Sequence, residues 1–102
     1  LLNKGTIFFC GNGGSASDSQ HLVAEFIGRF KEDRSPLRAV SLTSDTSVLT
    51  CISNDFNYEN VFSRQIEALG KKNDTLIALS TSGKSKNIEK VLKQAKANQL
   101  KP

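Results

Sequence analysis

Two short loops rich in glycine and serine could bind a phosphate group. The first is "CGNGGSAS" at residues 10–17, and the second is "STSGKS" at residues 80–85. Each follows a short apolar run and precedes a helical pattern. Their backbone amides would therefore lie at helix N-termini, where partial positive charge attracts anions, and the hydroxyls add further donors. The plainer alternative is a serine-rich turn that caps the next helix.

Neither loop fits a nucleotide-binding motif completely. In the second loop "GKS" resembles a Walker sequence, but Ala78 stands where this motif needs a glycine, five residues before Gly83. The first loop matches the dinucleotide fingerprint at Gly11, Gly13 and Ala16. That fingerprint also needs an acidic residue about 20 positions further on, whereas the first acid past the second predicted strand is the distant Asp45. We therefore expect no nucleotide cofactor, and a dinucleotide-binding oxidoreductase is the outside alternative.

A histidine and a glutamate follow the first loop at helical spacing. His21 and Glu25 lie at i and i+4, hence on one helix face, and Asp18 and Arg29 extend this polar stripe. In the simplest interpretation Glu25 pairs with Arg29 and His21 is a hydrogen-bonded core histidine. Near a phosphate-binding loop, the same pair could supply a general base with its partner, or two metal ligands. Proton transfer on a phosphorylated substrate would use such a pair.

A third polar segment is "ISNDFNY" at residues 52–58, with Asn54 and Asp55 between apolar flanks. We expect a loop here. It is either an Asx-type turn or a source of hydrogen bonds to a polyhydroxylated ligand, and the residues alone leave both interpretations open.

The surrounding pattern predicts an α/β domain that would bring the two loops together. Buried strands are expected at 6–10, 37–42 and 74–80. Helices are expected at 15–30, at 44–53, at a segment ending before Gly70, and at 86–98. The first helix would begin with a Ser15–Asp18 capping pair and the second with Asp45 as its cap. This alternation indicates a parallel sheet, in which both loops would face one crevice at the carboxyl ends of the strands.

Apolar residues at helical spacing give each long helix one core face. In the first helix these are Leu22, Val23, Phe26, Ile27 and Phe30. In the third they are Phe62, Ile66 and Leu69, and in the last Ile88, Val91, Leu92 and Ala95.

Length and composition limit the classes of protein. The chain has 102 residues, enough for one core at most; because it begins at Leu1 and ends at "QLKP", we expect a piece of a larger domain. No apolar run approaches the roughly 18 residues that span a bilayer.

Cys10 and Cys51 are isolated in apolar stretches, and we expect two buried, reduced thiols in a cytoplasmic protein. The net charge of +4 gathers on lysines without interleaved aromatics, so we expect neither nucleic acid nor membrane as a partner.

Three stretches together resemble the sugar isomerase (SIS) domain family. They are "CGNGGSASDSQHLVAEFIGRF", "ISNDFNYENVFSRQIEALG" and "STSGKS", in the family's order and close to its spacing. The resemblance implies a flavodoxin-like, doubly wound parallel sheet of about five strands, three of them visible here. Residues 1–102 would then be a partial SIS domain that lacks an N-terminal helix and the C-terminal strands and helices.

Within the family, the chain closely resembles the isomerases of phosphorylated seven-carbon sugars. This resemblance implies a cytoplasmic homotetramer that converts sedoheptulose 7-phosphate to D-glycero-D-manno-heptose 7-phosphate. That aldose–ketose isomerisation leads toward ADP-heptose and lipopolysaccharide.

The resemblance also assigns roles to residues. The phosphate would be bound by Ser80, Thr81, Ser82 and Ser85, and the sugar would be lined by Asn12, Gly13, Gly14, Ser15, Asn54 and Asp55. Glu25 would be the catalytic base that acts through an enediol. His21 would join Glu25 as a zinc ligand in those members that bind zinc. The family's second catalytic histidine and a glutamine ligand lie in a C-terminal helix, so we expect residues 1–102 alone to be inactive.

The family also contains non-catalytic binding modules. One branch resembles a replication-initiator-associating protein, which lacks a glutamate at the position of Glu25 and carries arginine at that of Ser82. Another is a sugar-phosphate-sensing regulator that is fused to a helix-turn-helix. Both Glu25 and Ser82 match the isomerase, so the enzyme is the favoured hypothesis and a binding module is the alternative.

Overall fold

A computed structural model of the chain describes residues 5–28 and 35–101. Its sheet has three strands, β1 (Ile7–Gly11), β2 (Ala39–Ser41) and β3 (Thr75–Leu79). They pair in parallel in the order β2-β1-β3, so β1 is central. In this register Phe8 lies opposite Val40 on one side and Leu76 on the other. The predicted parallel α/β class is confirmed, although β2 is shorter than the expected strand at 37–42.

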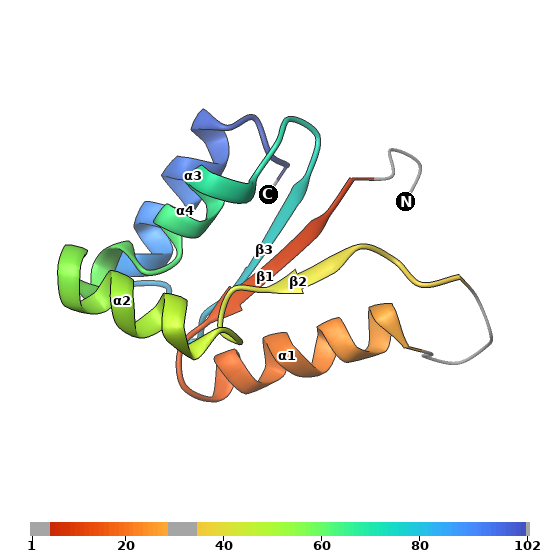
Figure 1. Ribbon diagram of the computed structural model, residues 1–102, viewed down its shortest axis with the longest axis horizontal. Coiled ribbons are helices and arrows are strands. Elements are labelled where there is room, and N and C mark those ends of the chain that lie inside the picture. Colours follow the sequence, from red (N-terminus) through yellow and green to blue (C-terminus); the bar gives the residue numbers. More distant parts are fainter. Residues whose placement is uncertain (1–4, 29–34, 102) are drawn as a thin grey trace.

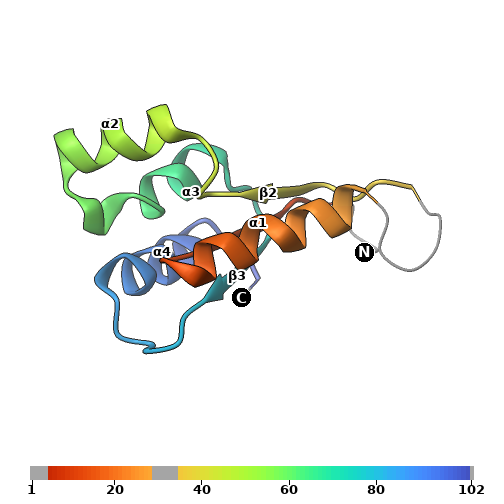
Figure 2. The same ribbon diagram turned by 90° about the horizontal axis from the view of Figure 1, so that it is seen from below.

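Helices cover both faces of the sheet. They are α1 (Gly14–Ile27), α2 (Thr46–Phe56), α3 (Ser63–Leu69) and α4 (Lys86–Ala97), with a short 3-10 turn η1 (Tyr58–Asn60). Figure 1 shows α1 on one side of the strands and α2, α3 and α4 on the other. In the view of Figure 2, α1 passes in front of the strands. No helix in the described ranges is long and apolar enough to cross a membrane.

Strand β1 is buried on both faces because alternate side chains point into two different cores. Phe8 and Cys10 belong to the larger core, which α3 and α4 close with residues such as Ile66 and Val91. Ile7 and Phe9 belong to the smaller core, beneath α1. The apolar face of α1 seals this core with Leu22, Val23 and Phe26. The two cores fix both helix layers to the strand from which the first loop emerges.

The start of α1 differs from the predicted one. The helix begins at Gly14, with Gly13 as N-cap and no side-chain cap hydrogen bond, so the predicted Ser15–Asp18 capping pair is wrong. The physical reason is the backbone: Gly13 has φ +59°, and this turn starts the helix before Ser15 can act as a cap. Ile27 is also half exposed rather than in the core. Arg29 and Phe30 lie outside the described residues.

The segment predicted as a polar loop is largely helical. Asp45 caps α2 as predicted, since its Oδ1 accepts a hydrogen bond from Val48 N at 3.1 Å. The helix then continues to Phe56, so the expected loop at 52–58 is wrong and Asn54 and Asp55 lie in the last turn. Asn54 Nδ2 donates to Asp55 Oδ1 at 2.9 Å instead of supporting an Asx turn.

The two cysteines lie in different surroundings. Cys10 is buried as predicted, and desolvation raises the pKa of its thiol to about 12. Cys51 is exposed on α2, so the prediction of a second buried thiol is wrong. The prediction rested on the apolar stretch of sequence around Cys51, but only Ile52 of this helix is buried.

The predicted faces of the other helices hold with two exceptions. Ile66, Ile88, Val91 and Ala95 are buried, whereas Leu69 and Leu92 are about half exposed. Gly70 is the C-cap residue of α3, as predicted, and its N–H donates to Ile66 O.

Candidate functional site

The two loops rich in glycine and serine lie side by side at the carboxyl ends of β1 and β3. Gly11 and Leu79, the last residues of these strands, are paired in the sheet. Directly beyond them is a recess of about 50 Å³. Its lining is formed by Asn12, Ser15, Leu79, Ser80, Thr81, Ser82 and Ser85. The predicted crevice shared by both loops is present.

Two glycines of the first loop are needed by the backbone itself. A Cβ added to Gly11 would lie 2.7 Å from Ser15 Cβ and 2.9 Å from Leu79 O, so only glycine allows α1 to start this close to β3. Gly13 has the positive φ that turns the chain into α1. Gly13 and Gly14 are exposed at the helix N-terminus and are not among the residues that line the recess.

The second loop is shaped by its own serines. Ser80 Oγ accepts a hydrogen bond from Gly83 N at 2.8 Å, and Ser82 Oγ accepts one from Lys84 N at 3.2 Å. Ser85 is the N-cap of α4, but its side chain makes no cap hydrogen bond. Its hydroxyl therefore lines the recess with its hydrogen-bonding capacity available. Helix α4 points its positive end toward the same place.

A side-chain amide pair joins the first loop to α4, the helix that follows the second loop. Asn12 Nδ2 donates to Asn87 Oδ1, and Asn87 Nδ2 donates back to Asn12 Oδ1, both at 2.9 Å. Tyr58 Oη donates to the same Asn12 Oδ1 at 2.8 Å. Asn12 was expected at the site, whereas Asn87 and Tyr58 were not. The available signal was the position of Asn87, two residues after Ser85 in the first turn of α4.

The pair formed by His21 and Glu25 lies elsewhere, along α1. Its Nε2 and Oε2 atoms are 3.2 Å apart, as the i, i+4 spacing predicts. The histidine side chain is 74% exposed and that of the glutamate 32%, so the alternative interpretation of His21 as a core histidine is wrong. Ten residues separate Ser15 from Glu25, or about 15 Å of helix. Neither side chain lines the recess.

The donors of this pair suit zinc, which binds imidazole nitrogen and carboxylate oxygen in tetrahedral sites. Two ligands are too few for such a site. Within residues 5–28 and 35–101, no group of three or more histidine, cysteine, aspartate or glutamate side chains could hold a metal ion. A further histidine, cysteine, aspartate or glutamate ligand beside this pair would therefore come from outside this part of the chain.

Asn54 and Asp55 do not join the other predicted site residues. Both are exposed on α2 and absent from the lining of the recess. Asp55 Oδ2 instead accepts from the Cys51 thiol at 3.7 Å on the same helix. Their predicted contact with a sugar would need a ligand that extends beyond the recess.

Comparisons with known proteins agree with this arrangement. The family model described as SIS domain matches residues 1–101. A phosphoheptose isomerase of Helicobacter pylori is 57% identical over 101 residues, which are 99% of this chain and 53% of that protein. One from Campylobacter jejuni is 56% identical over 96 residues, 94% of this chain and 52% of that protein.

Solved structures give the same result. A phosphoheptose isomerase from Neisseria gonorrhoeae superposes with a TM-score of 0.90 at 47% identity, covering 98% of this chain and 51% of that one. One from Francisella tularensis gives 0.93 at 34% identity, with 98% and 52% covered. The chain thus spans about half the length of the relatives it matches. With a family model that covers nearly all of its residues, the chain belongs to the SIS domain family.

Proposed function

We propose that the protein is a phosphoheptose isomerase, which converts sedoheptulose 7-phosphate to D-glycero-D-manno-heptose 7-phosphate. The observation that carries this proposal is the recess between the two loops, where five hydroxyl residues meet the N-terminus of α4. Relatives bearing that name share more than half of their residues with this chain over the matched length. Such a product supplies heptose for lipopolysaccharide and related glycans.

The second loop would bind the phosphate. Hydroxyls of Ser80, Thr81, Ser82 and Ser85 surround the recess, and the dipole of α4 favours an anion there. Because Gly83 and Lys84 already donate to serine side chains, the loop is held in its shape before a ligand arrives. Preorganised donors of this kind lose little entropy on binding. Asn12 and Ser15 would contact the sugar next to its phosphate.

Glu25 would act as the base. It removes a proton from C1 of the ketose while the oxygen on C2 gains one, which gives an enediol. A proton then returns to C2, the hydroxyl on C1 loses its own, and the aldose carbonyl forms. His21, 3.2 Å from the carboxylate, would orient it. Asn54 and Asp55 would meet the distal hydroxyls.

Zinc fits the donor types of His21 and Glu25, and these two residues would hold it together with ligands from outside the described residues. When bound, the ion would polarise the sugar oxygens as a Lewis acid. We also propose that the protein works as a homotetramer in the cytoplasm, as the resemblance to the family implies. The exposed His21 leaves the face of α1 that carries it open for further groups.

A direct assay tests this function. The full-length protein is incubated with sedoheptulose 7-phosphate in D₂O, and the products are followed by NMR. We expect the aldose 7-phosphate to form with deuterium at C2, because an enediol is protonated by a base that exchanges with solvent. No aldose would refute the enzymatic proposal, and binding without turnover would favour the sugar-phosphate-sensing module.

A further inference from the structure

Asn87 is a buried polar residue next to the recess that the proposed chemistry does not use. Its side chain is on the first turn of α4, and only 4% of the residue is exposed. A buried amide needs partners for its donors and acceptors. The partner here is the amide of Asn12, which lines the recess, and the two side chains satisfy each other through two hydrogen bonds.

The pairing determines how Asn12 faces a ligand. Its Oδ1 accepts from both Asn87 and Tyr58, while its Nδ2 donates to Asn87 only among the described residues. An amide nitrogen carries two N–H groups. No described residue accepts the second N–H of Asn12, so this donor remains available to a ligand in the recess, whereas the oxygen already accepts from two donors. An anionic or hydroxylated ligand would meet a donor, not a lone pair.

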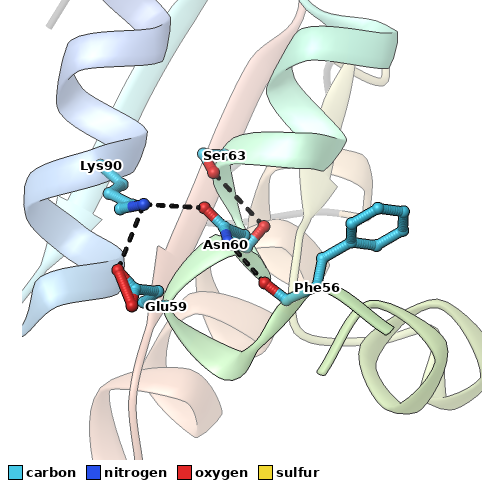
Figure 3. Close-up of polar contacts among 5 residues, drawn as sticks. All are labelled: Phe56, Glu59, Asn60, Ser63 and Lys90. Atoms are coloured by element: carbon cyan, nitrogen blue, oxygen red, sulfur yellow. Dashed lines mark hydrogen bonds and ion pairs between the residues drawn. The ribbon is translucent and has the colours of Figure 1, made fainter. Parts of the chain in front are cut away.

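Tyr58 is itself held in place from α4. Figure 3 shows Lys90 reaching across to η1, the short turn that begins with Tyr58. Lys90 Nζ lies 3.1 Å from Glu59 Oε2 and donates to Asn60 Oδ1 at 3.2 Å. Ser63 Oγ donates to Asn60 O at 3.3 Å and extends this set of contacts into α3. Helix α4 thus supports Asn12 twice, directly through Asn87 and indirectly through η1.

We propose that Asn87, assisted by Tyr58, is a positioning residue that sets the amide of Asn12 and the spacing of the two loops for a sugar phosphate. This inference rests on the proposed function. Asn87 is two residues after Ser85, at the start of α4. Because Asn87 is hydrogen-bonded to Asn12, a movement of the phosphate-binding loop would also change the position of the Asn12 amide. Loss of Asn87 should weaken substrate binding, although Asn87 itself does not line the recess of about 50 Å³.

The test compares two asparagines of the same helix segment in the full-length protein. Asn87→Ala removes the pair with Asn12, and Asn98→Ala is the matched control at the far end of α4. Asn98 Nδ2 donates to Ile66 O and Gly70 O, both at 3.1 Å, so it has a purely structural role away from the loops. KM and kcat for sedoheptulose 7-phosphate and the melting temperature are measured for both.

We expect Asn87→Ala to raise KM about tenfold, as the loss of one to two well-made hydrogen bonds would, with a smaller change in kcat. Asn98→Ala should lower the melting temperature and leave KM within about twofold of the parent. Tyr58→Phe, which removes one hydroxyl from an exposed ring, should raise KM about threefold without loss of folding.

If the parent protein converts sedoheptulose 7-phosphate, the proposed function holds. An unchanged KM in both Asn87→Ala and Tyr58→Phe would then overturn the inference alone. An equal rise in KM for Asn98→Ala would also overturn it, because the effect would then come from general stability. A parent protein that does not convert the substrate would refute the proposed isomerase, and the inference with it.

Discussion

The recess between the loops and the face of α1 that carries His21 and Glu25 are built in opposite ways. The shape of the recess is fixed by contacts within the chain. These are a paired strand end, two hydrogen bonds from backbone N–H groups to serine hydroxyls, and a reciprocal amide pair. The pair on α1 has a side chain 74% exposed and meets no third metal-ligating group among the described residues. The proposed phosphate-binding loops are thus held in place by contacts within the chain. The proposed catalytic pair on α1 is partly exposed to solvent.

Phosphate binding and proton transfer depend on the fold in different ways. Donors for a phosphate come from the backbone and hydroxyls at helix N-termini, which a parallel sheet gathers at one edge. A base must also be placed against the reacting carbons and shielded from water, and a single helix face cannot do that. Variants on the two regions should therefore affect different kinetic constants.

The largest effect is expected on α1. Glu25→Gln keeps the size and hydrogen bonding of the side chain but removes the base, so kcat should fall by about 10² to 10⁴ with little change in substrate affinity. Steady-state kinetics of the full-length protein measure this. Glu67→Gln, at an exposed position of α3, is the control and should behave as the parent. Turnover of Glu25→Gln within a few-fold of the parent would remove Glu25 from the mechanism.

A smaller effect is expected in the second loop. Ser85→Ala removes a hydroxyl that makes no cap hydrogen bond, so α4 should keep its stability. A hydrogen bond to a charged phosphate contributes about 1.5–3 kcal/mol, and KM should rise at least tenfold at nearly constant kcat. Ser47→Ala, in the first turn of α2, is the matched control. A fall in kcat with unchanged KM would place Ser85 outside the phosphate site.

The smallest effect concerns the buried strand that leads into the first loop. Cys10 directly precedes Gly11 in β1 and is buried, whereas Cys51 is exposed. At pH 8.5 iodoacetamide should label Cys51 rapidly in the native protein and Cys10 only after denaturation, as peptide mass spectrometry can measure. Rapid labelling of Cys10 in the native protein would mean that solvent and reagent reach the end of β1, which would contradict its burial.

The same thiol gives a pH dependence with a defined sign. Burial raises the pKa of Cys10 from 9.0 to about 12, so its neutral form is favoured in the folded state. Its contribution to stability is present below pH 9 and is lost as the pH rises toward 12. Cys10→Ala should therefore lose less stability than the parent over this range, measured by urea unfolding.

The sequence predicted the gathering of the loops because strand, loop and helix alternate along it with clear periodicity. It predicted Asp45 as a cap, since capping is a local interaction. It was wrong about a loop at Asn54 and Asp55 and about the burial of Cys51, because how far a helix continues and which side it buries depend on tertiary packing. It missed Asn87, whose role arises only when a residue 75 positions away comes into contact. The roles of the site residues in binding and catalysis stay predictions.

In the proposed enzyme, binding and chemistry would reside in these two separate regions. Calorimetric titration of full-length Glu25→Gln and Ser85→Ala with sedoheptulose 7-phosphate tests this division. We predict that Glu25→Gln binds within about threefold of the parent's Kd and that Ser85→Ala binds at least tenfold more weakly. Parental affinity in Ser85→Ala together with lost affinity in Glu25→Gln would contradict this division of the site.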